Sequence, residues 1–138
     1  MNDCIFCIIA RHEKSVNVVW EDDIVIAFLD MDPNTDGHTL IVPKKDIRDI
    51  HELDDESSLH IMRTAKVLAG IIEKTFGFDG IEIRAVSGAF QDVPHFHLHV
   101  FGRNKNNDIS TIYPSGIHNE LEYLSMNAEK IRKNLIRE

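Results

Sequence analysis

The first half of the chain places short apolar runs between turn residues, a pattern typical of β-strands. Three such runs, rich in Val, Ile, Trp and Phe, lie at residues 17–21, 24–29 and 38–43. The pair Asp22–Asp23 predicts a hairpin turn between the first two runs. A short helical turn is expected before them, at residues 4–10.

Residues 54–77 have helical periodicity instead. Asp54 is a suitable N-cap, Asp55 and Glu56 are favourable in the first turn, and Gly77 can end the helix. The apolar residues recur at helical spacing: Leu59, Met62, Ala65, Leu68, Ile72 and Phe76. A final amphipathic helix is marked by Leu121, Leu124, Ala128, Ile131 and Leu135.

Two further strands are predicted at residues 81–85 and 96–101, and the polar residues 104–116 are expected to form a loop. Consecutive short strands with one long helix inserted late favour an antiparallel sheet covered by helices. We therefore predict an α+β fold with five antiparallel strands, one long helix and a C-terminal helix. No repeat or linker divides the sequence, so we expect residues 1–138 to form a single domain.

Charge and hydropathy exclude several classes of protein. The net charge is −8, and the cluster of Lys44, Lys45 and Arg48 is interrupted by Asp46 and Asp49. Because phosphate neutralisation by basic residues supplies most nucleic-acid affinity, DNA or RNA is not expected as a ligand. No apolar run approaches the roughly 20 residues that span a bilayer, and the N-terminus does not resemble a secretion signal. We expect a cytoplasmic protein with no membrane partner.

Residues 95–101, HFHLHVF, carry the most informative pattern. Because strand side chains alternate between faces, His95, His97 and His99 would share one face at roughly 7 Å intervals. The apolar residues between them would fill the core behind that face. Imidazole titrates near neutral pH, so a neutral nitrogen can attack phosphorus, and flanking imidazoles can stabilise an oxyanion or protonate a leaving group. The pattern favours nucleophilic catalysis.

A metal-dependent hydrolase is another interpretation, in which two of these histidines and a further His or carboxylate bind an ion. The C-x-x-C pair formed by Cys4 and Cys7 also suggests metal binding or redox chemistry. Thioredoxin-like chemistry needs that pair at a strand-to-helix junction, whereas here it precedes every predicted strand.

The sequence H-x-H-x-H followed by two apolar residues is the signature of the histidine-triad family. Three other blocks, CIFCIIA, VVWEDDIVIAFLDMDP and GHTLIVPKK, occur in that family's order and spacing. The chain resembles the family over residues 4–50 and 81–103, in its phosphoramidase-like branch. The resemblance implies a homodimeric nucleotide hydrolase that cleaves at the α-phosphate of purine nucleotide conjugates and requires no cofactor for catalysis. Nucleoside phosphoramidates are the first expected substrates, and dinucleoside polyphosphates are a close alternative.

The resemblance also implies residue roles. His97 would be the nucleophile that forms a nucleotidyl-histidine intermediate, which water then hydrolyses. His99 would hold the phosphate and assist the leaving group, the main chain at His95 would orient His97, and His38 would lie beside the triad. Asp30 would bind the ribose. The base pocket would be lined by Ile5, Phe6, Ile9, Phe28 and Leu40, although from the residues alone core packing is the simpler explanation.

The loop at residues 84–92 departs from the family pattern. Gln91 matches, but Phe90 and Asp92 stand where Gly and Ser often contact phosphate in the phosphoramidase branch. With Gln91 and Asp92 as expected nucleotide contacts, Asp92 would add negative charge beside an anionic ligand. We therefore expect a changed substrate preference or loop route. The same departure supports an alternative function, a nucleotide-binding regulatory protein with vestigial activity.

Some bacterial relatives bind structural zinc through C-x-x-C, a His after the P-K-x stretch, and the first triad histidine. The corresponding residues here are Cys4, Cys7, Asp46 and His95, with Asp46 in place of the usual His. His51 is the one other histidine near enough to Asp46 in sequence to substitute for it. Without zinc, the cysteines would be two unpaired, partly buried thiols.

Overall fold

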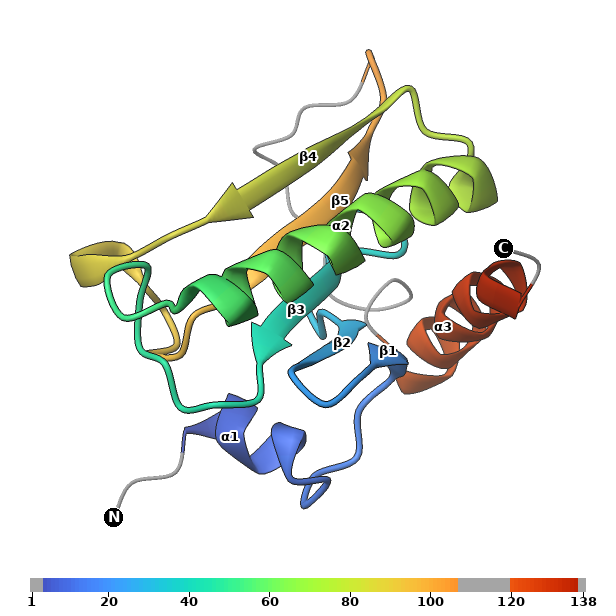
Figure 1. The fold of residues 1–138 in the computed structure, drawn as a ribbon. Helices are drawn as coiled ribbons and strands as arrows, with labels where there is room; N and C mark the ends of the chain where they lie inside the picture. Colours follow the sequence, from blue (N-terminus) through green and yellow to red (C-terminus); the bar gives the residue numbers. More distant parts are fainter. Residues whose placement is uncertain (1–3, 107–119, 137–138) are drawn as a thin grey trace.

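The computed structural model describes residues 4–106 and 120–136. Its elements are α1 (Ile5–Ala10), β1 (Val18–Glu21), β2 (Val25–Leu29), β3 (Thr39–Pro43), α2 (Asp55–Phe76), β4 (Gly80–Ala85), the 3₁₀ turn η1 (Gly88–Phe90), β5 (Leu98–Arg103) and α3 (Leu121–Ile136). The strands form one antiparallel sheet in the order β1-β2-β3-β5-β4 (Figure 1). The predicted α+β architecture is confirmed. Most of the loop predicted at 104–116 lies outside the described residues.

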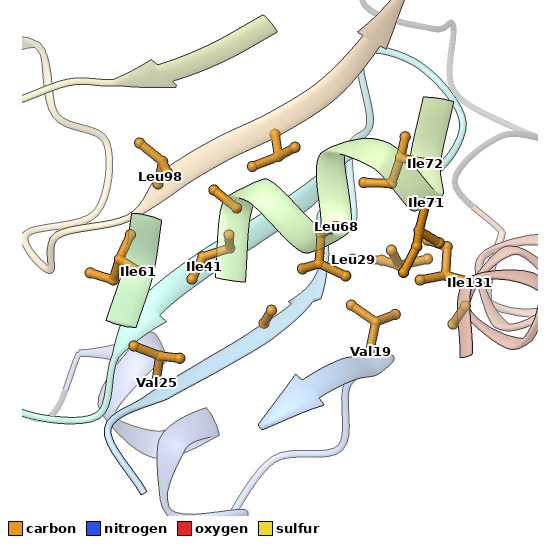
Figure 2. Close-up of a cluster of buried hydrophobic side chains, with 14 of the residues drawn as sticks. Val19, Val25, Leu29, Ile41, Ile61, Leu68, Ile71, Ile72, Leu98 and Ile131 are labelled. Atoms are coloured by element: carbon orange, nitrogen blue, oxygen red, sulfur yellow. The ribbon is translucent and has the colours of Figure 1, made fainter. Parts of the chain in front are cut away.

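Both faces of the sheet are covered at β2 and β3, which explains why these two strands are buried at every position. Alternate residues point to opposite faces. One set, including Val25, Leu29 and Ile41, packs against α2 and α3 in the main core (Figure 2). The other set, including Ile26 and Leu40, packs against α1 in a smaller cluster. The α1 face of the sheet is therefore available to form a pocket, while the α2 face stabilises the fold.

The predicted boundaries of α2 are confirmed by its capping groups. The Asp54 carboxylate accepts a hydrogen bond of 3.2 Å from the Ser57 backbone N–H, and Gly77 ends the helix in the left-handed region at φ 70°. The predicted apolar stripe was wrong at two positions, since Leu59 and Met62 are 53% and 49% exposed. Ile61 is buried against the sheet instead. In the described part of the chain, no helix is long and apolar enough to cross a membrane.

The strand predicted at 96–101 begins later than expected, at Leu98. The Phe96 N–H donates to the Ile47 carbonyl at 2.7 Å, which draws the preceding segment toward the loop after β3 rather than into the sheet. His99 therefore lies within β5, whereas His95 and His97 lie in the extended segment before it. The expected alternation still holds for the apolar residues between them, which pack into the main core.

Candidate active site

A cavity of about 220 Å³ opens on the α1 face of the sheet, and we call it the nucleotide pocket for the ligand that its lining suggests. Nine residues singled out in the sequence line it: Ile5, Phe6, Ile9, Phe28, Leu40, Asp30, Asp92, His97 and His99. Five further residues line it without having been assigned a role from the sequence: Leu29 and Met31 within a family block, Val93 after Asp92, and Lys14 and Val16 outside every motif. The structure thus gathers residues from α1, β2, β3 and β5 around one space.

The pocket has an apolar end built on the Phe6 ring of α1. That ring meets Phe28 edge-on at a centroid distance of 5.6 Å and meets the His97 imidazole at 5.0 Å. Leu40, opposite His99 in the pairing of β3 and β5, continues the apolar wall toward the histidines. An apolar slot with a few polar groups at one end suits a planar base attached to a polar sugar and phosphate.

His97 is held in one tautomer by the main chain. Its Nδ1 lies 2.8 Å from the His95 carbonyl oxygen, and only 3% of its side chain is exposed. A carbonyl oxygen can only accept, so Nδ1 carries the proton and Nε2 keeps its lone pair. Because His97 lines the nucleotide pocket, this lone pair is placed to act as a nucleophile.

A chain of hydrogen bonds also fixes His38 and His99. The Asn34 backbone N–H donates to His38 Nδ1 at 2.9 Å, so the His38 proton is on Nε2. His38 Nε2 lies 2.9 Å from His99 Nδ1 and donates to it, which leaves His99 with a proton on Nε2. Burial lowers the pKa of His38 to about 3 and that of His99 to about 4. Both rings are neutral at pH 7, and His99 Nε2–H can donate a hydrogen bond in the pocket.

Asp30 follows β2 at the polar end of the nucleotide pocket. Its Oδ1 accepts from the Asp32 backbone N–H at 2.9 Å, and its Oδ2 lies 3.6 Å from His38 Nε2. Burial raises the pKa of Asp30 to about 6. Because pH 7 still exceeds this value, the carboxylate is mainly ionised there despite its partly dry environment, where it can accept hydrogen bonds strongly.

The altered loop separates Gln91 from Asp92. The Gln91 side-chain amide donates to the Arg48 carbonyl at 2.7 Å, and Gln91 is not among the residues that line the nucleotide pocket. Asp92 does line the pocket, and its carboxylate lies 3.4 Å from His97 Nε2 with 83% of its side chain exposed. The negative charge expected near a phosphate is thus placed beside the atom that would attack it.

The four predicted metal ligands come together at the N-terminus of α1. The Cys4 and Cys7 sulfurs are 3.0 Å apart and lie 3.2 and 3.3 Å from His95 Nδ1, while an Asp46 oxygen lies 3.9 Å from that nitrogen. His95 Nε2 donates to the Pro43 carbonyl at 2.8 Å, so the lone pair of Nδ1 faces the sulfurs. Two sulfurs, one imidazole and one carboxylate fit a tetrahedral zinc ion.

The protonation state of Cys7 depends on whether an ion is bound in this cluster. Burial, together with the neighbouring Cys4 and Asp46, raises the pKa of the Cys7 thiol to about 12, so the thiol stays protonated without a cation. A metal ion would displace that proton, because thiolate is the form that binds. His51 is not among the clustered donors.

Asp30, His38 and His99 form a second group in the described residues whose donor atoms all lie within 4.8 Å of one another. The hydrogen bond between His38 and His99 already uses the facing nitrogens of these two rings. Within this group, an ion would therefore have to displace the proton that the two rings share.

Comparison with known proteins agrees with this geometry. A family model described as the HIT domain matches residues 11–106, which include the whole of the sheet and the three alternating histidines His95, His97 and His99. The chain belongs to the histidine-triad (HIT) family. An uncharacterised HIT-like protein from Borreliella burgdorferi is 33% identical over 139 residues, covering 98% of this chain and 100% of the relative.

Two solved HIT structures add detail. A zinc-bound histidine triad family protein from Mycobacterium smegmatis superposes with a TM-score of 0.85 at 26% identity, covering 98% of this chain and 94% of that one. A hypothetical histidine triad nucleotide-binding protein from Sulfolobus tokodaii has a TM-score of 0.85 at 28% identity, covering 97% and 93%. Each covers nearly the whole of this HIT chain.

Proposed function

We propose that this HIT protein hydrolyses purine nucleotide conjugates at the α-phosphate, with His97 as the nucleophile. The observation that carries the proposal is the hydrogen bond from His97 Nδ1 to the His95 carbonyl, because it leaves the Nε2 lone pair in the pocket. Nucleoside phosphoramidates are the first substrates we propose, ahead of dinucleoside polyphosphates. The nucleotide-binding description of the Sulfolobus relative supports a nucleotide ligand.

The reaction would proceed in two steps. His97 Nε2 forms a bond to the α-phosphorus while the bond to the leaving group breaks. His99 Nε2–H donates a hydrogen bond to the departing atom, which takes its proton from water. The hydrogen bond from His38 Nε2–H to His99 Nδ1 keeps His99 in this tautomer. Water then cleaves the nucleotidyl-histidine to release the nucleoside monophosphate. Asp30 would hold the ribose, and the apolar end of the pocket would hold the base.

Zinc, if bound by Cys4, Cys7, Asp46 and His95, would have a structural role in this proposal. It would tie the start of α1 to the segment before β5, and its chemistry would be limited to holding deprotonated thiols together. The zinc-bound Mycobacterium relative supports this assignment. We also propose a cytoplasmic location, since free thiols of this kind persist where the environment is reducing.

Mass spectrometry of the intact protein tests the proposal. The protein is mixed with an adenosine phosphoramidate and quenched rapidly with alkaline denaturant, because a P–N bond is labile in acid, as wild type, His97→Ala and, as a matched control, the exposed His12→Ala. We expect an AMP adduct in wild type and His12→Ala that is absent in His97→Ala. A parallel sample with a strong chelator should form the adduct equally well. Loss of the adduct on chelation of a Cys7→Ala variant, which lacks the structural zinc site but keeps Asp30, His38 and His99, would instead favour a metal-dependent hydrolase that uses these three residues.

The contact between Asp92 and His97 favours a second candidate, a nucleotide-binding regulatory protein with vestigial activity. A carboxylate 3.4 Å from Nε2 occupies space that a phosphate needs and repels its charge. Tight nucleotide binding, together with slow turnover that His97→Ala leaves unchanged, would support this candidate over the hydrolase.

We further propose that the protein is a homodimer joined through β4. In the described part of the chain, β4 is at the edge of the sheet and is hydrogen-bonded to β5 alone. Ile83 on this strand is 44% exposed, which is unusual for an edge that remains in water. Ile83→Lys should produce a monomer in light scattering, whereas wild type should have the mass of two chains.

A further inference from the structure

A second cavity, of about 480 Å³, adjoins the nucleotide pocket, and we call it the outer groove. Ile5, Asp92 and Val93 line both cavities. The outer groove is completed by Cys4, Asp46, Arg48, Glu52 and Pro94. It therefore begins at the carboxylate beside the nucleophile and extends toward the loop that follows β3.

Hydrogen bonds between two loops hold the outer groove open. The Gln91 amide donates to the Arg48 carbonyl at 2.7 Å, and the Ile50 N–H donates to Ser87 Oγ at 3.1 Å. The Arg48 N–H in turn donates to Glu52 Oε1 at 3.1 Å, which fixes that carboxylate on its own loop. These hydrogen bonds link the loop after β3 to the loop between β4 and β5, so the two walls of the groove are held in fixed relative positions.

Building on the proposed hydrolase function, we propose that the outer groove receives the leaving group of the substrate and selects amines with a second, cationic end. A phosphorus bonded to His97 Nε2 lies next to Asp92, because Asp92 is 3.4 Å from that nitrogen. The nucleotide fills the first pocket, so the other part of the conjugate extends past the shared residues Ile5, Asp92 and Val93.

The lining determines the chemical class. Asp46, Glu52 and Asp92 supply three carboxylates, and Arg48, which lies 3.6 Å from both Asp49 and Glu52, supplies one positive charge. A metal ion on Asp46 would neutralise that residue and leave Glu52 and Asp92 against the single charge of Arg48, so the lining stays negative. A cation is therefore attracted, while a polyphosphate leaving group is repelled.

The apolar part of the groove completes this specificity. Ile5, Val93 and Pro94 provide surface for an alkyl stem between the reacting nitrogen and the distant charge. As the bond from His97 Nε2 to phosphorus forms, the electron pair of the P–N bond goes to the amine nitrogen, which accepts a hydrogen bond from His99 Nε2–H and takes its proton from water. The distal ammonium is unchanged and leaves through the groove with the amine.

The test uses AMP phosphoramidates of putrescine, n-pentylamine and γ-aminobutyrate, which match in length and differ in end charge. Wild type should rank kcat/KM in that order, with about two- to fivefold between neighbours, as expected for partly exposed ion pairs. Glu52→Gln keeps the hydrogen-bond acceptor and should reduce the preference for putrescine over pentylamine by about half or more. The control Glu56→Gln, an exposed carboxylate outside both cavities, should keep it.

Equal kcat/KM for the three conjugates, or an unchanged ratio in Glu52→Gln, would overturn the outer groove as the leaving-group site while the AMP adduct still supported the hydrolase. If no conjugate forms an adduct, the hydrolase proposal fails. The affinities of the conjugates then test separately whether the outer groove prefers a cationic end. Calorimetry with His97→Ala, which holds the conjugates without reaction, should then give the same charge ranking in Kd. Equal Kd values would overturn the inference.

Discussion

His38 donates to His99 across 2.9 Å, from the position before β3 to the second residue of β5. This bond fixes the proton of His99 on the nitrogen that can reach a leaving group. We expect His38→Ala to lower kcat about ten- to a hundredfold for an amine phosphoramidate, because the departing amine nitrogen would lose the oriented hydrogen bond from His99. The loss should be small for a nitrophenyl ester of AMP, whose leaving group needs no proton.

Comparing kcat for the two leaving groups separates the loss of assistance to the leaving group from a general loss of folded structure. A misfolded or repacked variant would lose activity on both substrates equally, and that outcome would contradict the positioning role of His38. His12→Ala is the matched control, since His12 is 59% exposed and pairs with Glu21 away from the pocket.

Asp30 carries a stability cost that depends on pH. Burial raises the pKa of its folded form to about 6 from the usual 3.8, so the folded state holds the proton more tightly than the unfolded state. The cost is absent below pH 3.8, grows as the pH rises, and is complete above about pH 6. Asp30→Asn, which keeps the oxygen that accepts from Asp32, should raise the free energy of unfolding at pH 7.5 by on the order of 2 kcal/mol.

Urea unfolding at several pH values measures this difference. The gain in Asp30→Asn should shrink through the interval between pH 6 and pH 4, while the affinity for AMP falls because the ribose loses a charged acceptor. Asp23→Asn, at an exposed turn position, should show no such pH-dependent gain. If the gain in the free energy of unfolding of Asp30→Asn does not change with pH, ionisation of Asp30 does not destabilise the folded state.

Zinc binding should be stoichiometric and should involve Asp46. We expect one zinc ion per chain, a rise in melting temperature on binding, and at least about tenfold weaker affinity in Asp46→Ala. Competition with a chromogenic chelator gives the affinity, and calorimetry gives the stoichiometry. His51→Ala should bind zinc like wild type, because His51 is not in the donor cluster. Equal affinities for the two variants would remove Asp46 from the ligand set.

Gly37 should not tolerate a side chain. It has φ 82°, and a Cβ added there would lie 2.5 Å from the Phe76 ring. Gly37→Ala should therefore lower the free energy of unfolding by about 1–3 kcal/mol through backbone strain and overlap. Gly70→Ala is the opposite control, because no atom lies within 4 Å of its added Cβ in the middle of α2. That change should stabilise the protein by about 0.5–1 kcal/mol.

The helix α2 could be predicted to the residue because its limits are set locally. Asp54 caps its own helix, and Gly77 adopts the conformation that glycine allows most easily. The sheet was predictable for a similar reason, since apolar runs and turn residues alternate along the chain. The position of His97 outside the strand was harder to predict from the sequence, because the Phe96 N–H is held by the carbonyl of Ile47, which is far away in sequence.

The pocket residues illustrate the same difference. Asp30 and the histidines were identified through their motifs, whereas Lys14 lies in no motif and lines the nucleotide pocket only after the chain folds. Likewise, Glu52 is an ordinary charged residue in the sequence. It becomes part of a groove because loops from two distant segments are bonded together through Gln91 and Ser87.

The helix α1 is shared by two places that could bind different ligands. Phe6 forms a wall of the nucleotide pocket against His97, and on the same six-residue helix Cys7 faces His95. An ion that orders this helix through its cysteines can change the affinity for nucleotide. Because such coupling is reciprocal, bound nucleotide must then change the affinity for the ion by the same factor. The short helix is thus the element that would couple binding at one site to binding at the other.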